Sequence, residues 1–145
     1  MATPRTDWLL LALDAAGSKG LTPVQLQKTL FLLGKKMPDQ VGTEFYDFKP
    51  YHYGPFDRAV YTDAEKLAAT GRIEIEQREG ENFNRYIITR DGEVDVSRLA
   101  YEAKDVFEYL KDKLLPWIRS QTFQSLVSAI YAEYPEMRKH SVFQG

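Results

Sequence analysis

Residues Tyr51–Tyr61 read YHYGPFDRAVY, an aromatic-rich segment that runs through Gly-Pro directly into an amphipathic pattern. Glycine suits a helix cap and proline suits the first helical turn, so we expect a helix to begin at Gly54-Pro55. Apolar residues then recur at helical spacing as far as Gly71, a typical left-handed C-cap. The segment therefore predicts a helix directly before a region with strand character.

Two short strands are predicted after this helix. Apolar and polar residues alternate over Arg72–Arg78 and again over Phe83–Thr89, with a turn at Glu79–Asn82 between them. On the other side of the aromatic segment, Met37–Phe48 predicts a loop, with a short extended piece at Glu44–Phe48.

Two further helices are predicted upstream of that loop. The first is expected over about Asp7–Ala16, with Thr6 as its candidate N-cap and apolar residues nearly all round, so it should be central and buried. The second has the clearest start signal of the chain. Thr22 is a good N-cap, Pro23 suits the first helical position, and Gln25 completes a capping box.

The C-terminal part of the chain predicts two more helices. A long helix is expected to start near Ser97, and Pro116 should kink or end it. Thr122 can cap a last helix that stops before Pro135. The long helix carries an apolar stripe at spacings of three and four: Leu99, Ala103, Val106, Leu110, Leu114 and Trp117.

These elements predict a mainly α fold with a small β-hairpin, in the α+β class. We expect a single domain over residues 1–145. Its winged-helix-like core, three helices plus a wing, would span about 6–92, and a C-terminal helical extension would span about 95–135.

Composition restricts the functional classes. The net charge is −2, whereas nucleic-acid-binding domains usually carry a basic surplus, so a DNA-binding role is weakened. The chain has no cysteine, which excludes disulfides, thiolate metal sites and cysteine nucleophiles. The apolar run Trp8–Leu13 is too short to span a bilayer and lacks the flanks of a signal peptide, so we expect a cytoplasmic protein without a membrane partner.

Catalytic chemistry has little support in the sequence. His52 could pair with a nearby aspartate, but an imidazole among tyrosines is more often a hydrogen-bonded packing residue. Glu74 and Glu76 are explained by ion pairing with Arg72 and Arg78 at a sheet edge. The sequence contains no Gly-rich phosphate loop, metal triad or nucleophile elbow. We expect no enzyme activity, no cofactor and no metal.

A DNA-binding regulator is the alternative to a protein-binding module. In a winged-helix protein, the helix before the wing would read the major groove. Its charges here sum to −1, from Arg58 and Lys66 against Asp57, Asp63 and Glu65, which disfavours contact with phosphates. Phosphate contacts would come from Lys35, Lys36, Arg85 and Arg90. Such a regulator would be a homodimer through the stripe of Ser97–Leu115.

The protein-binding hypothesis starts from the aromatic residues. Seven of them lie between Phe45 and Tyr61, and tyrosine is enriched in protein interfaces and hot spots. We expect Phe48 and Phe56 to pack in the core, and some of the tyrosines to face a groove. The tyrosines concerned are Tyr46, Tyr51, Tyr53 and Tyr61.

Two short segments carry a family resemblance. Leu26–Phe31 reads LQKTLF, and Tyr53–Phe56 reads YGPF, with Val60–Tyr61 after it. They resemble the Leu-Gln-Lys-Leu-Leu-Tyr signature and the aromatic-Gly-Pro-Val motif, with its following Val-Tyr, of the Panacea antitoxin domain, also called SocA-like. The resemblance covers roughly Leu21–Gly71. Phe56 stands where the family usually has valine, a departure that suits a distant branch.

The resemblance implies a non-enzymatic domain that neutralises a neighbouring toxin by direct contact and sometimes doubles as a regulator. Among the matched residues, Gln27, Lys28, Tyr53 and Tyr61 carry polar groups that are expected to be free for a partner. The full set of partner-binding candidates is Gln27, Lys28, Tyr51, His52, Tyr53, Phe56, Arg58 and Tyr61.

Overall fold

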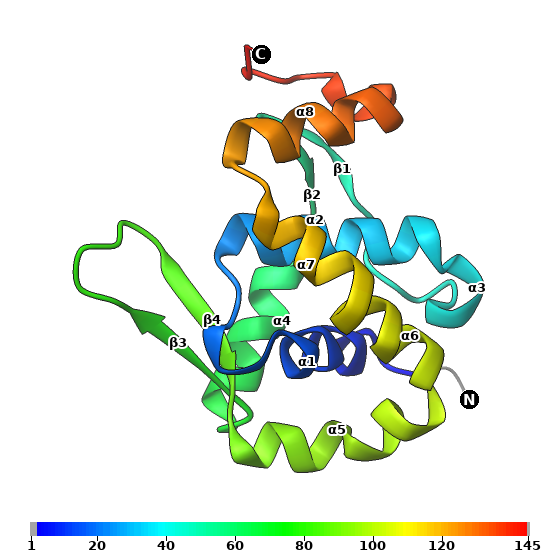
Figure 1. The fold of residues 1–145 in the computed structure, drawn as a ribbon, viewed down its shortest axis with the longest axis vertical. Helices are drawn as coiled ribbons and strands as arrows, with labels where there is room; N and C mark the ends of the chain where they lie inside the picture. Colours follow the sequence, from blue (N-terminus) through cyan, green and yellow to red (C-terminus); the bar gives the residue numbers. More distant parts are fainter. Residues whose placement is uncertain (1–2, 145) are drawn as a thin grey trace.

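The computed structural model describes residues 3–144 as a mainly helical α+β fold with two small antiparallel sheets, which confirms the predicted fold class (Figure 1). Its η1 and η3 are short 3-10 turns and η2 is a π-helical turn. In chain order the elements are α1 (Arg5–Ala16), η1 (Gly17–Lys19), α2 (Pro23–Lys36), α3 (Pro38–Val41), β1 (Lys49–Tyr51), β2 (Gly54–Phe56), α4 (Arg58–Ala69), β3 (Ile73–Gln77), β4 (Asn84–Ile88), α5 (Arg90–Glu102), α6 (Lys104–Tyr109), η2 (Leu110–Leu114), α7 (Leu115–Ser120), α8 (Phe123–Glu133) and η3 (Pro135–Arg138).

Helix α1 is the central element, as its all-round apolar pattern predicts. Every residue of Trp8–Leu13 is buried, and α1 contacts α2, α4, α5, α6 and β4. In Figure 1 it runs through the middle of the lower part of the molecule. The predicted cap is wrong, because the helix begins before Thr6, with Pro4 in the N-cap position and no side-chain cap.

Helix α2 begins as predicted. The Thr22 hydroxyl accepts a hydrogen bond from the Gln25 backbone N–H, and the Gln25 side chain accepts one from the Thr22 N–H. Pro23 occupies the first helical position. These contacts lie within one turn, so they depend on no other part of the chain.

The Gly54-Pro55 segment forms a strand, so the predicted helix start is wrong. Strand β2 pairs antiparallel with β1, and Gly54 lies opposite Tyr51. Glycine also suits a tight hairpin, and Gly54 has φ 102°, which other residues rarely adopt. Helix α4 begins at Arg58 instead, where the Asp57 carboxylate accepts a hydrogen bond from the Ala59 N–H at 2.9 Å. The predicted extended piece likewise lies later in the chain, in β1.

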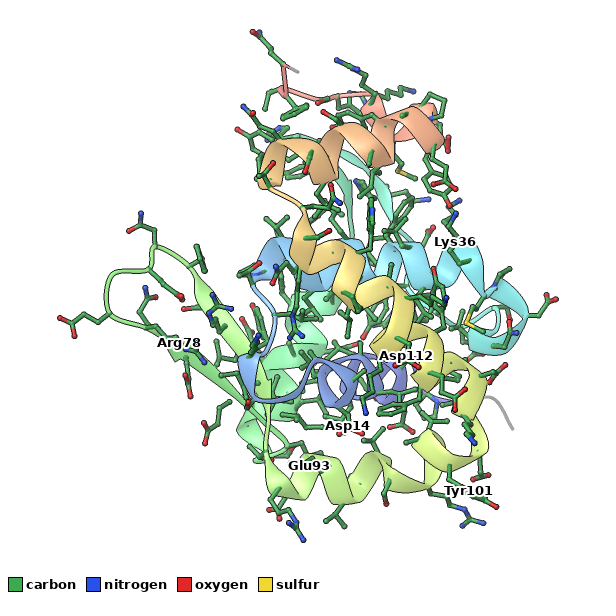
Figure 2. The ribbon with its side chains drawn as sticks, in the orientation of Figure 1. Asp14, Lys36, Arg78, Glu93, Tyr101 and Asp112 are labelled. Carbon is green, nitrogen blue, oxygen red and sulfur yellow. The ribbon has the colours of Figure 1, made fainter. Side chains whose placement is uncertain are left out.

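The predicted hairpin of two strands, which we call the wing, is confirmed in its antiparallel pairing. Strands β3 and β4 are antiparallel, with Ile75 opposite Tyr86, and they project to one side of the helices (Figure 1). Leu21 exchanges backbone hydrogen bonds with Tyr86, which attaches the wing to the start of α2. On the wing, Arg78 pairs with Glu76 at 3.4 Å (Figure 2), whereas Arg72 pairs with Asp95 of α5.

Helix α5 begins at Arg90, earlier than the predicted start near Ser97. Thr89 is its N-cap and accepts a hydrogen bond from the Gly92 N–H at 3.2 Å. A Cβ on Gly92 would lie 2.2 Å from the Arg72 carbonyl oxygen. The Asp-Gly pair usually favours a turn. Here it is part of a helix that packs closely on the connection between α4 and β3.

The long C-terminal stripe is interrupted, and all of its residues except the exposed Trp117 face the chain's own core. The helix breaks at Ala103, and the π-helical turn η2 precedes Pro116, so the helix widens there and continues through α7. Val106, Leu110 and Leu114 are buried, and η2 contacts α1 and α2. The stripe is thus not the free face that the predicted homodimer requires. Helix α8 begins after Thr122 and ends before Pro135, as predicted.

Substitutions of Gly17 and Gly20 can test how closely the wing packs against the turn before α2. Both have left-handed φ, 69° and 62°, but a Cβ on Gly20 would lie 2.4 Å from the Tyr86 carbonyl oxygen, whereas one on Gly17 meets nothing within 4 Å. We expect Gly17→Ala to lower the free energy of unfolding by about 1–3 kcal/mol through backbone strain. Gly20→Ala should lower it by about 1–3 kcal/mol more through overpacking. Urea denaturation measures both values, and equal losses would contradict this role of Gly20.

Candidate protein-binding surface

Gln27 holds the start of α4 in place. Its side chain is 2% exposed, and its Nε2 donates to the Asp57 carbonyl oxygen at 2.9 Å. The Asp57 N–H in turn donates to Gln27 Oε1 at 3.1 Å. The amide side chain thus satisfies both backbone polar groups of Asp57, as a neighbouring strand would.

Lys28 holds the β1–β2 hairpin, which precedes α4 in the chain. Its side chain is only 5% exposed, and its Nζ donates to the Pro55 carbonyl oxygen at 3.1 Å. A Cβ on Gly54 would lie 3.5 Å from the Lys28 Nζ, so the lysine passes directly beneath the hairpin. Burial lowers the pKa of Lys28 to about 8. The predicted free polar groups of Gln27 and Lys28 are therefore engaged within the chain, because the hairpin covers the face of α2 that carries them.

Two of the three acidic residues counted against DNA binding are also engaged. The Asp57 carboxylate accepts hydrogen bonds from the N–H groups of Asp47 and Ala59, both at 2.9 Å. Asp63 is buried, where Tyr46 donates to it at 2.7 Å and Arg5 at 2.9 Å. Tyr46 is therefore a buried core residue, whose hydroxyl is engaged by Asp63 and is not free for a partner.

The ion pair of Asp63 with Arg5 removes one negative charge from this count. The remaining charges of α4 and its N-cap then sum to zero, from Arg58 and Lys66 against Asp57 and Glu65. The electrostatic objection to contact between α4 and phosphates is weaker than the sequence predicts.

Four of the predicted binding residues lie in one row of rings, stacked except for the edge-on contact between Phe56 and Tyr61. We call this row, His52, Tyr51, Phe56, Tyr61 and Tyr86, the aromatic ladder. Its successive ring centroids are 4.3, 5.0, 5.7 and 6.2 Å apart. The ladder runs from the exposed turn of the β1–β2 hairpin, across α4, to the buried end at β4.

Exposure changes along the aromatic ladder. Tyr51 is 47% exposed and His52 is also exposed, whereas Phe56 and Tyr61 are partly buried. Phe56 does not belong to the hydrophobic core, so the prediction that it packs there is wrong, whereas Phe48 packs against the core as a partly buried residue. Arg58 is exposed and lies two residues after Phe56, at the start of α4. The outer half of the ladder and Arg58 present rings, an imidazole and a guanidinium to the solvent.

Tyr53 belongs to a different cluster from the other tyrosines of the hairpin. It is exposed, and its ring packs edge-on against Phe123 of α8, with centroids 5.3 Å apart. Phe123 also packs near Phe143 of the C-terminal segment. That segment is tied to the hairpin by the Val142 N–H, which donates to the His52 carbonyl oxygen at 2.9 Å.

The four predicted phosphate-contact residues do not lie together. Lys35 and Lys36 are at the C-terminal end of α2, where Lys36 pairs with Glu133 (Figure 2). Arg85 lies near the opposite end of α2, because it donates to the Lys19 carbonyl oxygen at 3.4 Å, and it pairs with Glu81. Arg90 is exposed at the start of α5.

Three aromatic residues that were not among the predicted binding residues belong to these surfaces. Tyr86 completes the aromatic ladder, and Phe83 and Phe123 are large exposed rings on the wing and on α8. The spacing of Phe123 from Leu126 fits an apolar helix face, so its sequence context gives no sign of exposure. Only Phe83, a large aromatic residue at the edge of a polar turn, carried a signal of exposure.

Among residues 3–144, the structure contains no cluster of three or more His, Asp or Glu side chains suited to a metal ion. Within the same residues, no helix has the length and hydropathy needed to cross a membrane. No protein-family model and no curated protein sequence matches the chain.

Gln27→Glu tests the contact with Asp57. The change keeps the shape of the side chain but replaces the donor with a carboxylate oxygen that faces the Asp57 carbonyl. We expect the free energy of unfolding to fall by about 2–3 kcal/mol at pH 7. Gln124→Glu, at an exposed position of α8, should change it by less than about 0.5 kcal/mol. Equal effects in urea denaturation would show that Gln27 does not carry the hairpin–helix junction.

The lowered pKa of Lys28 predicts a pH dependence of stability. Between pH 8 and about 10.5 the unfolded chain keeps the Lys28 proton while the folded chain releases it, so stability should rise with pH. The unfolding free energy of the wild type, relative to that of Lys28→Met, should rise by up to about 3 kcal/mol as the pH is raised over this window. Urea denaturation at a series of pH values measures it, and a constant difference would contradict the assignment.

Proposed function

We propose that the chain is a non-enzymatic, cytoplasmic protein-binding module that neutralises or regulates a partner protein by direct contact, as an antitoxin does. The observation that carries this proposal is the aromatic ladder, whose outer rings are exposed while Phe56 and Tyr61 are partly buried and Tyr86 is buried. Rigid aromatic side chains supply large contact area at low entropic cost, and tyrosine and arginine are enriched in binding hot spots.

The binding face is preorganised in the free chain. Gln27 and Lys28 hold the main chain on both sides of Phe56, and Asp57 caps α4 directly behind it. Burial raises the pKa of Tyr61 to about 12, so its hydroxyl stays protonated even at a pH at which a free tyrosine ionises. The proposed contact residues are Tyr51, His52, Phe56, Arg58 and Tyr61, with Tyr53 on the neighbouring cluster.

The Panacea-like assignment remains a proposal that the arrangement of the chain supports. Apart from the short α3 and the β1–β2 hairpin between α2 and α4, the order α1, α2, α4, β3, β4 matches the order expected of a winged-helix core. The two segments that carry the resemblance also meet in space, since Gln27 and Lys28 of the first hydrogen-bond the backbone of Pro55 and Asp57 at the second. In this role the two polar side chains of the first segment serve the scaffold rather than the partner.

A DNA-binding regulator is the second candidate, because the ion pair of Asp63 with Arg5 removes one of the negative charges counted against it. Apart from that pair, Arg58 and Lys66 balance Asp57 and Glu65. Lys35 and Lys36 lie at the opposite end of α2 from Arg85, and Arg90 lies at the start of α5, which makes a continuous contact with one duplex difficult. Binding that falls steeply as salt is raised in a titration with random duplex DNA would support this candidate.

The proposal is tested by capture of the partner from the native host, followed by affinity measurements with the identified protein. We expect Tyr51→Ala and His52→Ala each to weaken binding by about tenfold or more, because hot-spot truncations cost above ~1.4 kcal/mol. Tyr101→Ala is the matched control, since Tyr101 is 83% exposed at the end of α5 (Figure 2).

The control variant should bind the partner as wild type does, and all three variants should retain the wild-type melting temperature. Equal affinity of Tyr51→Ala, His52→Ala and wild type would reject the aromatic ladder as the binding face. Recovery of nucleic acid without a protein would place the DNA-binding regulator first.

A further inference from the structure

A groove separate from the aromatic ladder lies between the wing and α8. It has a volume of about 410 Å³ and shares none of its residues with the ladder. Phe83 and Phe123 are both 42% exposed at its walls. The start of α2, the α7–α8 connection and the wing border it, on the side to which the wing projects (Figure 1). Its apolar lining is Pro23, Val24, Phe83, Ile118, Phe123 and Leu126.

The polar groups in the wall of this groove are largely satisfied within the chain. Thr22 and Gln25 form the capping box of α2, and Thr122 accepts a hydrogen bond from the Ser125 N–H at the start of α8. Gln121 Nε2 donates to the Ser120 hydroxyl at 3.2 Å. Binding in the groove must therefore come mainly from burial of apolar side chains against rings and aliphatic groups.

Positive charge borders one end of the groove. Arg119, next to the lining residue Ile118, donates to the Ala16 and Gly20 carbonyl oxygens at 2.6 and 3.0 Å. Arg85 donates to the neighbouring Lys19 carbonyl oxygen at 3.4 Å, and its guanidinium lies 5.8 Å from the centroid of the Phe83 ring at the groove wall, so both arginines lie near the turn before α2.

The net charge at this end is positive although the whole chain carries −2. Lys19, Arg85 and Arg119 give three positive charges, and Glu81, paired with Arg85, gives one negative charge, which leaves +2. The first turns of α2 and α8 contain no acidic side chain to offset the positive ends of their helix dipoles.

We infer that this groove binds an acidic amphipathic segment of the partner protein. Apolar side chains of the segment enter between Phe83 and Phe123, and its carboxylates face the end with Arg85 and Arg119. The inference rests on the proposed function in that the occupant belongs to a protein partner, and it adds a second contact with defined chemistry. Nucleic acid fits this groove poorly, because its lining is apolar.

The test selects peptides from a random display library on the immobilised full chain. We expect the enriched peptides to combine Leu, Ile or Phe with Asp or Glu. Phe83→Ala should weaken their binding by about tenfold, and Arg85→Gln by about threefold to tenfold with a smaller salt dependence.

Two matched controls lie on α5, away from the groove residues. Tyr101→Ala removes an exposed ring, and Arg98→Gln removes an arginine whose ion pair with Glu102 has the same sequence spacing as that of Arg85 with Glu81. Both controls should bind the selected peptides within about twofold of wild type.

Several results would overturn the inference. These are a selection that yields no peptide, enrichment of basic or uncharged peptides, insensitivity of the peptides to Phe83→Ala, and displacement of the peptides by duplex DNA. Self-association that Phe83→Ala abolishes would assign the groove to a second copy of the chain and would overturn it too.

The ladder and groove proposals fail separately. If Tyr51→Ala prevents capture of the partner and Phe83→Ala does not, the proposed function stands and the groove inference falls. If Phe83→Ala prevents capture and Tyr51→Ala does not, the groove remains and the aromatic ladder is rejected as the binding face.

Discussion

The structure depends on the pairing of two polar side chains of α2 with the backbone of the β1–β2 hairpin. A polar group removed from water needs a partner, and a short two-stranded hairpin has too little apolar surface to be stable alone. Gln27 and Lys28 meet both needs, because they satisfy the carbonyls of Pro55 and Asp57 and the N–H of Asp57 while the hairpin covers them. The direction of α4, and hence of the aromatic ladder, follows from this junction.

Lys28 makes this junction costly in free energy. A buried ammonium group with one carbonyl partner is disfavoured relative to water, which is why its pKa falls. An apolar residue of similar length would avoid that penalty but would leave the Pro55 carbonyl without its donor. The lysine therefore specifies one placement of the hairpin rather than adding stability, a role that buried polar groups have in other folds.

The hairpin divides its aromatic residues between two surfaces. Tyr51 and His52 begin the aromatic ladder towards α4, while Tyr53 faces Phe123 at the wall of the groove. Alternation along the strands and the turn between them send neighbouring side chains in different directions. A partner that contacts the hairpin turn can therefore reach both the ladder and the groove.

Part of the candidate site was predictable from the sequence. Tyr51, His52, Phe56 and Tyr61 were expected near one another because they lie within one short segment. The free polar groups of Gln27 and Lys28 were not correctly predicted, because helical periodicity places them beside the core face without saying what covers them. The cover is a hairpin about thirty residues later, and no local pattern encodes that contact.

The sequence by itself determined the features that depend on neighbouring residues. Thr22 and Thr122 cap their helices, and the two wing strands pair as their alternation predicts. Tertiary structure alone decided that Gly54-Pro55 forms a strand. It also decided that the helix carrying the C-terminal stripe breaks at Ala103 and widens into a π-helical turn before Pro116. Glycine and proline fit both a hairpin and a helix start, and an apolar stripe fits any apolar neighbour, so long-range packing has to choose between them.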